Sequence, residues 1–156
     1  MMDRAGVMAT AHTGVTVSNI DRSIAFYRDV LGFEVTDKID CRGELFEQIT
    51  GVSGAEIIVA YVKAPGHTLE LLQYTRPDDR VRCTARPCDP GALHLAFRVR
   101  NIEGVIAAVR QAGVTPVNPV IPEVADGPAK GLKAIYTKDP DGILIEFMED
   151  PRFATE

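Results

Sequence analysis

The stretch "HTGVTVSNIDRSIAFYRDVLG", residues 12–32, returns in altered form as "GALHLAFRVRNIEGVIAAVRQAG", residues 91–113. An offset of 82 residues aligns the two copies and matches residues of the same type at many positions. The matched pairs are His12 with His94, Val17 with Val99, Asn19 with Asn101, Ile20 with Ile102, Ile24 with Ile106, Ala25 with Ala107 and Arg28 with Arg110. Such an internal repeat predicts two copies of one supersecondary unit.

Each copy has the pattern of a strand followed by a helix. Residues 12–17 and 94–99 alternate between apolar and other side chains, which predicts strands with one apolar face. Asn19 and Asn101 then offer helix N-caps before apolar residues at helical spacing. The expected stop signals are two glycines suited to a left-handed C-terminal position, Gly32 and Gly113.

Further strand patterns follow each helix. They cover residues 33–39, 55–62 and 67–74 in the first half, and residues 113–117, 132–137 and 142–148 in the second. The chain therefore predicts an α+β fold made of two βαβββ modules. We expect one domain over residues 8–150, with modules 10–75 and 92–150 joined by a linker at 76–91.

A second irregular stretch, residues 116–131, is rich in Pro and Gly and lies inside the second module. Loops of this length are often lids or binding loops. A surface excursion without a role fits the same composition, so both interpretations stay open.

Bulk properties exclude several classes of function. The 156 residues, 46% of them apolar, suit one globular domain, and the net charge of −5 gives no basic field for nucleic acid. The longest apolar run, residues 57–62, is too short to span a membrane, and the N-terminal stretch does not resemble a secretory signal. An odd number of cysteines suits a reducing compartment, so we expect a cytoplasmic protein.

Side-chain direction points to one cluster of polar groups. The last strands correspond at an offset of 76, which places Glu70 opposite Glu146. Because side chains alternate along a strand, His12 and His94 face the side of the sheet that the helices do not cover. Glu70 and Glu146 each interrupt an apolar run. We therefore expect these two imidazoles and two carboxylates to share the open face of the sheet.

A carboxylate inside an apolar strand is costly unless a partner compensates its charge. A divalent cation is a partner that satisfies two imidazoles and two carboxylates at once, which predicts a metal site at His12, Glu70, His94 and Glu146. Zinc, nickel, cobalt, manganese and iron(II) all fit this donor set. Any one of these residues alone is more often merely solvated or hydrogen-bonded, but all four follow the same repeat. His67 has no counterpart in the second half, and we expect it to be exposed to solvent.

With these motifs the chain resembles the vicinal oxygen chelate superfamily, which includes glyoxalase I, methylmalonyl-CoA epimerase, extradiol dioxygenases and bleomycin-resistance proteins. The resemblance rests on "HTGVTVSNIDRSIAFYRDVLGFEV", "HTLELLQY", "LHLAFRV" and "DPDGILIEF", and covers nearly all of residues 12–150. It implies two βαβββ units whose curved mixed sheets form a cup around one divalent metal ion. The four residues above fall on the family's ligand positions.

The ligand set separates the branches of that superfamily. Extradiol dioxygenases resemble a His, His, Glu set without a ligand at the position of Glu70, whereas glyoxalase I and the epimerases use four ligands. The resemblance thus implies a glyoxalase-like lyase or isomerase that abstracts a proton next to a metal-chelated carbonyl, with Glu146 or Glu70 as catalytic base. The alternatives are an epimerase-like isomerase, an extradiol dioxygenase and a non-catalytic small-molecule binding or resistance protein. The chain differs from the methylmalonyl-CoA epimerases at the position of their catalytic glutamate, which is Gly54 or Ala55 here.

The expected partner is a small-molecule substrate, anionic or a thioester or glutathione adduct. Arg98, on the His94 face, and Lys130 and Lys133, around the irregular loop, are the candidate substrate-binding residues. The resemblance also implies a homodimer, with the site formed either within one chain or between exchanged chains.

Overall fold

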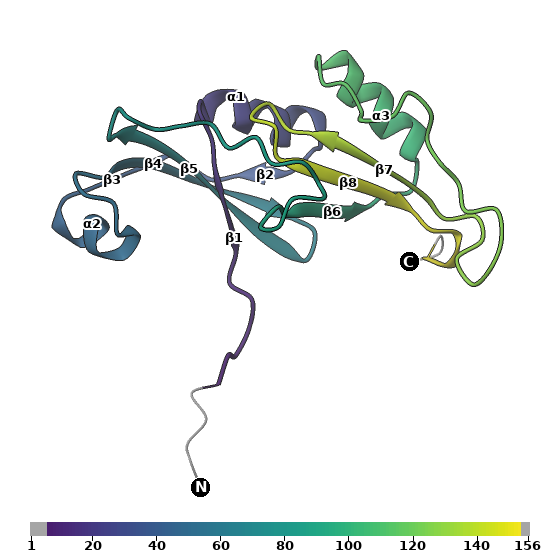
Figure 1. Cartoon of the computed structure of the whole chain (residues 1–156), viewed down its shortest axis with the longest axis horizontal. Helices are drawn as coiled ribbons and strands as arrows, with labels where there is room; N and C mark the ends of the chain where they lie inside the picture. The colour runs from purple at the N-terminus through teal and green to yellow at the C-terminus, as the bar shows by residue number, and fades with distance from the viewer. Residues whose placement is uncertain (1–5, 154–156) are drawn as a thin grey trace, which may run out of the picture. The chain divides into compact units, whose positions relative to one another are not determined.

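The computed structural model describes residues 6–153, and its chain divides into two compact units. Unit 1 comprises residues 6–20 and 33–78, and unit 2 comprises residues 21–32 and 79–153. Each unit has its own sheet, as Figure 1 shows.

The sheet of unit 1 has strand order β1-β5-β4-β2, with β3 also paired to β4. Its strands are β1 (Thr13–Thr16), β2 (Glu34–Val35), β3 (Ile39–Arg42), β4 (Glu56–Ala64) and β5 (His67–Arg76). The pair β1–β5 is parallel and the other pairs are antiparallel.

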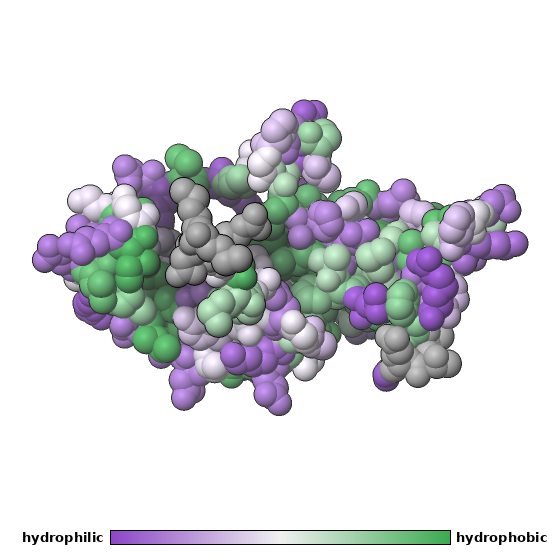
Figure 2. Space-filling model, turned by 90° about the horizontal axis from the view of Figure 1, so that it is seen from below, coloured by the Kyte–Doolittle hydropathy of each residue, from purple (hydrophilic) through white to green (hydrophobic). Residues whose placement is uncertain are grey.

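Between β3 and β4 lies α2 (Glu44–Thr50), a short helix beside β3 (Figure 1). It ends at Gly51, whose φ of 69° is the left-handed conformation that glycine adopts without steric cost. Leu45 and Ile49, four residues apart on this helix, are 62% and 68% exposed. Figure 2 shows hydrophobic surface at this end of unit 1.

The sheet of unit 2 has the order β6-β8-β7, with β6–β8 parallel and β8–β7 antiparallel. Its strands are β6 (His94–Arg98), β7 (Lys133–Lys138) and β8 (Leu144–Glu149). Helix α3 (Ile102–Gln111) lies along this sheet (Figure 1) and buries the apolar side chains Ile102, Ile106 and Val109. A 3₁₀ turn, η2 (Pro151–Phe153), follows β8.

The first helix is α1 (Ile20–Ala25), which continues as the π-helical turn η1 (Phe26–Val30). Its residues from Asp21 onward belong to unit 2. The buried side chains Phe26 and Tyr27 point inward from η1, with 4% and 0% exposure.

The sequence signals at the helix ends are largely confirmed. Asn101 caps α3, because its side-chain oxygen accepts a 2.9 Å hydrogen bond from the amide of Gly104. Gly32 and Gly113 have φ values of 74° and 80°, as expected of helix-terminating glycines.

The α+β fold with mixed sheets is confirmed, but its elements differ from the expected order in three places. Residues 113–117 form no strand, because Pro116 lacks an amide hydrogen, and Val117 makes a single ladder-like bond to the carbonyl of Tyr136. Residues 33–39 hold only the two-residue β2 and the first residue of β3. Helix α2 has no counterpart in the predicted order of elements.

Burial follows the predicted alternation on the first strand. Val15 and Val17 are 3% and 4% exposed, while Gly14 and Thr16 lie on the exposed face. Within residues 6–153 no helix is long and apolar enough to cross a membrane.

Candidate functional site

Strand register places the two predicted glutamates in equivalent positions of the two sheets. Glu70 of β5 lies beside Gly14 of the parallel strand β1, and Glu146 of β8 lies beside Ala96 of β6. Side chains two residues apart on a strand share a face. His12, two residues before Gly14, and His94, two residues before Ala96, are therefore directed to the faces that hold the glutamates.

The structure forms one His–Glu pair in each unit. The Nε2 atom of His12 lies 3.1 Å from Oε2 of Glu70, and Nε2 of His94 lies 3.2 Å from Oε2 of Glu146. The histidine side chains are 40% and 43% exposed, and each glutamate side chain is 18% exposed. The repeat in the sequence is thus a repeat in geometry, with the same atoms at nearly the same distance.

Each pair by itself offers two ligands. Across residues 6–153, the structure contains no group of three or more His, Cys, Asp or Glu side chains arranged to hold a metal ion. The two predicted halves of the ligand set are therefore each formed within their own unit, and their combination into one site stays a prediction.

Two tyrosines that were not among the predicted site residues accompany these pairs. Tyr61 of β4 lies directly across from Glu70, and Tyr136 of β7 lies directly across from Glu146. The Tyr61 hydroxyl donates a 2.8 Å hydrogen bond to Oε1 of Glu70. Both tyrosines stand in predicted strands, but their partners depend on the antiparallel register, which spacing along the chain does not give.

The negative charge of Glu70 affects its neighbours in unit 1. The hydrogen bond to Glu70 raises the pKa of Tyr61 above its usual value, and partial burial and the Glu70 charge add to the shift. Burial raises the pKa of the Cys41 thiol, with smaller contributions from the charges of Glu70 and Asp40. Both groups therefore keep their protons at neutral pH.

The three predicted substrate-binding residues lie in different surroundings. Arg98 shares the strand face of His94, but its guanidinium stacks on the ring of Phe153, with Cζ 3.7 Å from the ring centroid. Lys130 is exposed in the turn that begins at Gly127.

Lys133 lies on the opposite face of its sheet from Glu146, because it pairs with Glu149 in the register of β7 and β8. Its ammonium group contacts Oε1 of Glu103 on α3 at 2.6 Å. The ammonium group of Lys133, predicted to bind a substrate, is thus already paired with Glu103.

His67 differs from the expectation of a solvent-exposed residue. It is half-buried at the start of β5, where its ring faces β1. There its Nε2 atom lies 2.8 Å from Oγ1 of Thr13.

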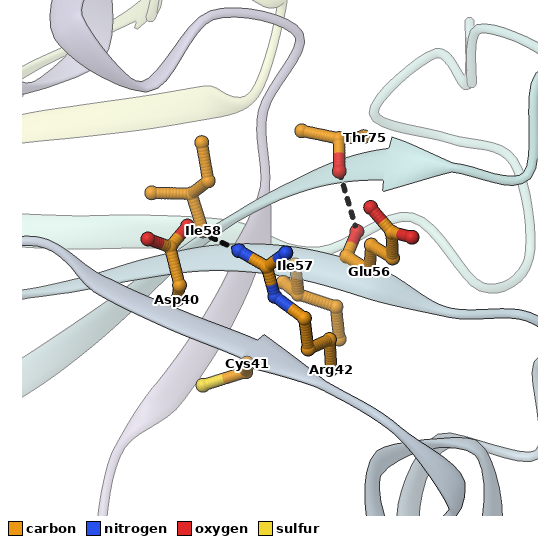
Figure 3. Close-up of a pocket in the computed structure, with 7 residues that line it drawn as sticks. All are labelled: Asp40, Cys41, Arg42, Glu56, Ile57, Ile58 and Thr75. Atoms are coloured by element: carbon orange, nitrogen blue, oxygen red, sulfur yellow. Dashed lines mark hydrogen bonds and ion pairs between the residues drawn. The ribbon is translucent and has the colours of Figure 1, made fainter.

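A pocket of about 210 Å³ lies at the end of β3 and β4 in unit 1 (Figure 3). Its lining is Asp40, Cys41, Arg42, Glu56, Ile57, Ile58 and Thr75. The Arg42 guanidinium lies 3.9 Å from the Asp40 carboxylate, so the charges at its rim are partly compensated. None of the predicted site residues lines this pocket.

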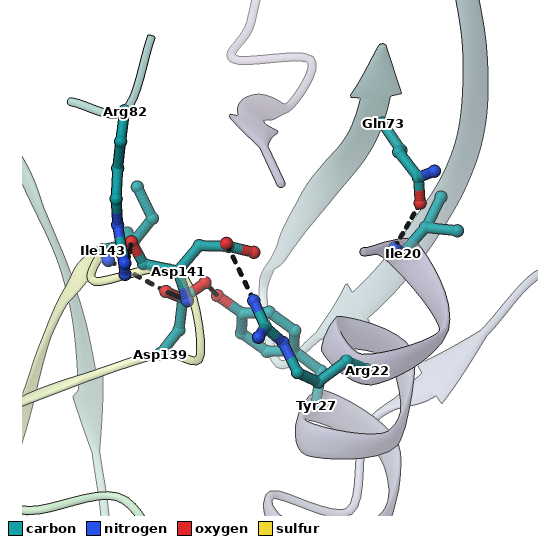
Figure 4. Close-up of polar contacts among 8 residues, drawn as sticks. All are labelled: Ile20, Arg22, Tyr27, Gln73, Arg82, Asp139, Asp141 and Ile143. Carbon is teal, nitrogen blue, oxygen red and sulfur yellow. Dashed lines mark hydrogen bonds and ion pairs between the residues drawn. The ribbon is translucent and has the colours of Figure 1, made fainter. Parts of the chain in front are cut away.

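A buried polar network in unit 2 fixes the turn between β7 and β8 (Figure 4). Asp139, 3% exposed, accepts 2.8 Å hydrogen bonds from the amides of Asp141 and Ile143 and a 3.4 Å bond from the hydroxyl of Tyr27. Arg22 pairs with Asp141 at 2.9 Å. The predicted turn "DPDG", residues 139–142, thus joins the first helix to the strand that carries Glu146.

The sequence matches one family model and several known proteins. Residues 9–147 match the family model described as Glyoxalase/Bleomycin resistance protein/Dioxygenase superfamily. A 2-epi-5-epi-valiolone epimerase from Actinomyces sp is 30% identical over 152 residues, covering 94% of this chain and 81% of that protein. A lactoylglutathione lyase from Haemophilus influenzae is also 30% identical, over 92% of this chain and 93% of that protein.

Solved structures show the same fold. A glyoxalase family protein from Bacillus cereus superposes with a TM-score of 0.81 at 21% identity, over 96% of this chain and 99% of that one. The family-model match confirms the expected superfamily, and this superposition confirms its fold.

Proposed function

Because the chain belongs to the Glyoxalase/Bleomycin resistance protein/Dioxygenase superfamily, we propose that it is a metal-dependent lyase or isomerase of the glyoxalase type. In this proposal the enzyme abstracts a proton from a carbon next to a chelated carbonyl group. The observation that carries it is the His–Glu pair formed at equivalent positions of both units, at 3.1 and 3.2 Å.

The donor chemistry of these pairs suits a divalent first-row ion. Imidazole nitrogens and carboxylate oxygens together are ligands for zinc, nickel, cobalt, manganese or iron(II). We propose that His12, Glu70, His94 and Glu146 supply the ligands of one such ion. Their partial exposure, 18% for each glutamate, leaves room for a ligand from solvent or substrate.

When bound, the ion would act as a Lewis acid on two adjacent oxygens of a substrate and make the neighbouring C–H bond more acidic. The chain itself then has to accept and return one proton. Glu146 or Glu70 is the group for this step, because a carboxylate close to the substrate can act first as base and then as acid. The Nε2 atoms of His12 and His94 lie 3.1 and 3.2 Å from these carboxylates, so each pair presents a nitrogen and an oxygen donor side by side.

An epimerase is the second candidate. Its support is the 2-epi-5-epi-valiolone epimerase that matches 94% of this chain, nearly the same share as the lactoylglutathione lyase. Both reactions move a proton at a carbon beside an oxygenated carbon, so they need the same proton-transferring group. They differ in whether the product is a stereoisomer or a rearranged thioester.

For the substrate we propose a small molecule with two adjacent oxygens, and for the assembly a homodimer that light scattering of the purified protein can test. Arg98 and Lys130 stay our candidates for contact with an anionic group of the substrate. Lys133 is the weakest of the three, because Glu103 already pairs with it.

The test is deuterium uptake from D₂O by acetoin and by the hemithioacetal of methylglyoxal and glutathione, followed by proton NMR. The protein is loaded separately with Zn²⁺, Ni²⁺, Co²⁺ and Mn²⁺. We expect metal-dependent uptake that EDTA abolishes, and a loss of about 10²–10⁴-fold when the catalytic carboxylate is changed to glutamine.

Oxygen consumption on catechol by the Fe²⁺-loaded protein is the opposing measurement. If that activity occurs and Glu70→Ala leaves it intact, the protein is an extradiol dioxygenase and the proposed reaction is wrong.

A further inference from the structure

The face of the unit 1 sheet that carries Glu70 changes from polar to apolar along the strands. Because neighbouring strands are paired, the residues on this face stand in rows across the sheet. In the first row, Gly14, Glu70 and Tyr61 lie side by side on β1, β5 and β4. The next two rows on β5, β4 and β3 form the apolar face, which consists of Leu72, Val59 and Ile39, and then Tyr74, Ile57 and Cys41.

The apolar face begins directly at the carboxylate. A Cβ atom added to Gly14 would lie 3.4 Å from Cδ1 of Leu72 and 3.9 Å from Oε2 of Glu70. A methyl group and a carboxylate oxygen therefore border the same glycine, and each further row is about 7 Å along the strand. Burial, and to a smaller extent the negative charge of Glu70, raises the pKa of the Cys41 thiol in the last row. The apolar face thus continues the surface that holds the His12–Glu70 pair.

Part of the apolar face is open to solvent. Ile57 and Val59 in its centre are buried, whereas Ile39 at its edge is 49% exposed. The half-buried members are Cys41, Leu72 and Tyr74. These partly open side chains leave an apolar strip, whereas a stable protein interface buries roughly 800 Å² on each partner. A strip of this kind suits a ring or a short chain of a small molecule.

The equivalent face of unit 2 is shorter and charged. Strands β7 and β8 have six residues each, against nine and ten in β4 and β5. In the row after Glu146, Arg98 lies beside Met148, and Asp150 directly follows β8. The repeat therefore preserves the His–Glu pairs but not the surfaces beyond them. This difference indicates that the surface beyond Glu70 has a role of its own.

We propose that the apolar face binds an aromatic ring or alkyl chain of the substrate, while the substrate's two adjacent oxygens approach the His12–Glu70 pair. The favoured substrate is then an α-hydroxyketone or a diketone with an apolar substituent. A glutathione adduct fits this face less well, because the face offers no partner for the charged groups of the peptide. This inference rests on the proposed function and narrows its substrate.

The first experiment compares two chelators that offer the same pair of oxygens, acetohydroxamate and benzohydroxamate. Calorimetry measures their binding to the Co²⁺-loaded full chain, and each affinity is corrected for that of the compound for free Co²⁺. We expect benzohydroxamate to bind at least about tenfold more tightly, because its ring is removed from water.

Leu72→Ser should reduce this preference to about threefold or less and keep the affinity for acetohydroxamate within about twofold of wild type. Met148→Ser, the matched control in unit 2, should retain the preference for benzohydroxamate. Circular dichroism checks that both variants are folded.

The second experiment needs no variant, because Cys41 reports on the apolar face of the wild-type chain. N-ethylmaleimide labels the thiols, and mass spectrometry of the peptides gives each rate. Cys83 and Cys88 are exposed and serve as internal controls. Benzohydroxamate at about ten times its Kd should slow the labelling of Cys41 about tenfold and leave the controls unchanged. Acetohydroxamate at the same multiple of its Kd should leave Cys41 as reactive as before.

Equal corrected affinities for the two hydroxamates, or protection of Cys41 by both or by neither, would overturn the role of the apolar face. If light scattering shows a dimer that Leu72→Ser separates, the face binds a second copy and the inference is wrong. A chain that binds neither Co²⁺ nor the hydroxamates contradicts the proposed function itself. The two failures are therefore distinguishable.

Discussion

The backbone amide of Ile20, the first residue of α1, donates a 2.6 Å hydrogen bond to Oε1 of Gln73 on β5 (Figure 4). The same relationship recurs in unit 2, where the amide of Ile102 donates to Oε2 of Glu149 at 2.7 Å. Each last strand thus supplies a side chain that satisfies the first amide of a helix. The repeat therefore extends to contacts that hold each helix start against the strand that carries a site glutamate.

These contacts predict a measurable contribution to stability at the start of α3. Asn101→Ala should lower the free energy of unfolding by about 1 kcal/mol, because it removes the acceptor for the amide of Gly104. Glu149→Ala should cost about 1–3 kcal/mol, because it leaves the buried amide of Ile102 without an acceptor. Urea unfolding monitored by circular dichroism measures both values.

Glu149→Gln is the matched control, since glutamine performs this role at position 73. It should retain most of the stability that Glu149→Ala loses. A loss as large as that of alanine would show that the charge of Glu149, not its hydrogen bond to Ile102, stabilises this end of the helix.

The turn network around Asp139 predicts a larger effect. Asp139→Ala removes the acceptor for the amides of Asp141 and Ile143 and for the Tyr27 hydroxyl, so we expect a loss of about 2–4 kcal/mol. Tyr27→Phe should cost about 1 kcal/mol or less, because its 3.4 Å bond is long. Equal losses for the two variants would contradict the view that Asp139 acts mainly through the backbone of its turn.

Asp139→Asn tests the charge separately. Burial raises the pKa of Asp139, so the folded state holds its proton more tightly than the unfolded chain does. The contribution of this group to stability is then greatest below the unfolded pKa of about 3.9 and falls as the pH rises toward the folded pKa. The stability of Asp139→Asn relative to wild type should therefore increase with pH across that window.

Asp150 has the opposite dependence on pH. Bidentate contact with Arg152, at 2.6 Å for the closest pair of atoms, lowers the pKa of Asp150 to about 2. The stability that this carboxylate contributes is present above the unfolded pKa of about 3.9 and is lost as the pH falls through about 2. Carboxyl NMR should show this titration directly, and Arg152→Ala should move it upward by about 1 unit or more.

Much of the fold could be predicted because the repeat and the two-residue alternation determine it. Val15 and Val17 are buried and their neighbours exposed, as alternation requires. Helix α2 was not predictable in this way, since Leu45 and Ile49 are exposed and the helix has no buried residue. The strand expected at residues 113–117 is absent, because the hydrophobic pattern takes no account of the amide hydrogen that Pro116 lacks.

For the candidate site, the His–Glu contact within each unit was predictable from the sequence. Parity and repeat symmetry placed His12 with Glu70 and His94 with Glu146, and both contacts are formed. The tyrosines were missed because they lie on β4 and β7, and their partners depend on antiparallel register rather than on spacing along the chain. The hydrogen bond from Tyr61 to Glu70 depends on the orientation of the tyrosine ring, which no pattern of residue types encodes.

The central claim is that His12, Glu70, His94 and Glu146 bind one divalent ion together, and elemental analysis tests it most directly. The purified protein, the four ligand-to-alanine variants and the control His67→Gln are dialysed against the same trace of Co²⁺ and measured by mass spectrometry. We predict one ion per chain in wild type and control, and a loss of affinity of more than about tenfold in every alanine variant. Undiminished metal in all four alanine variants would contradict the account.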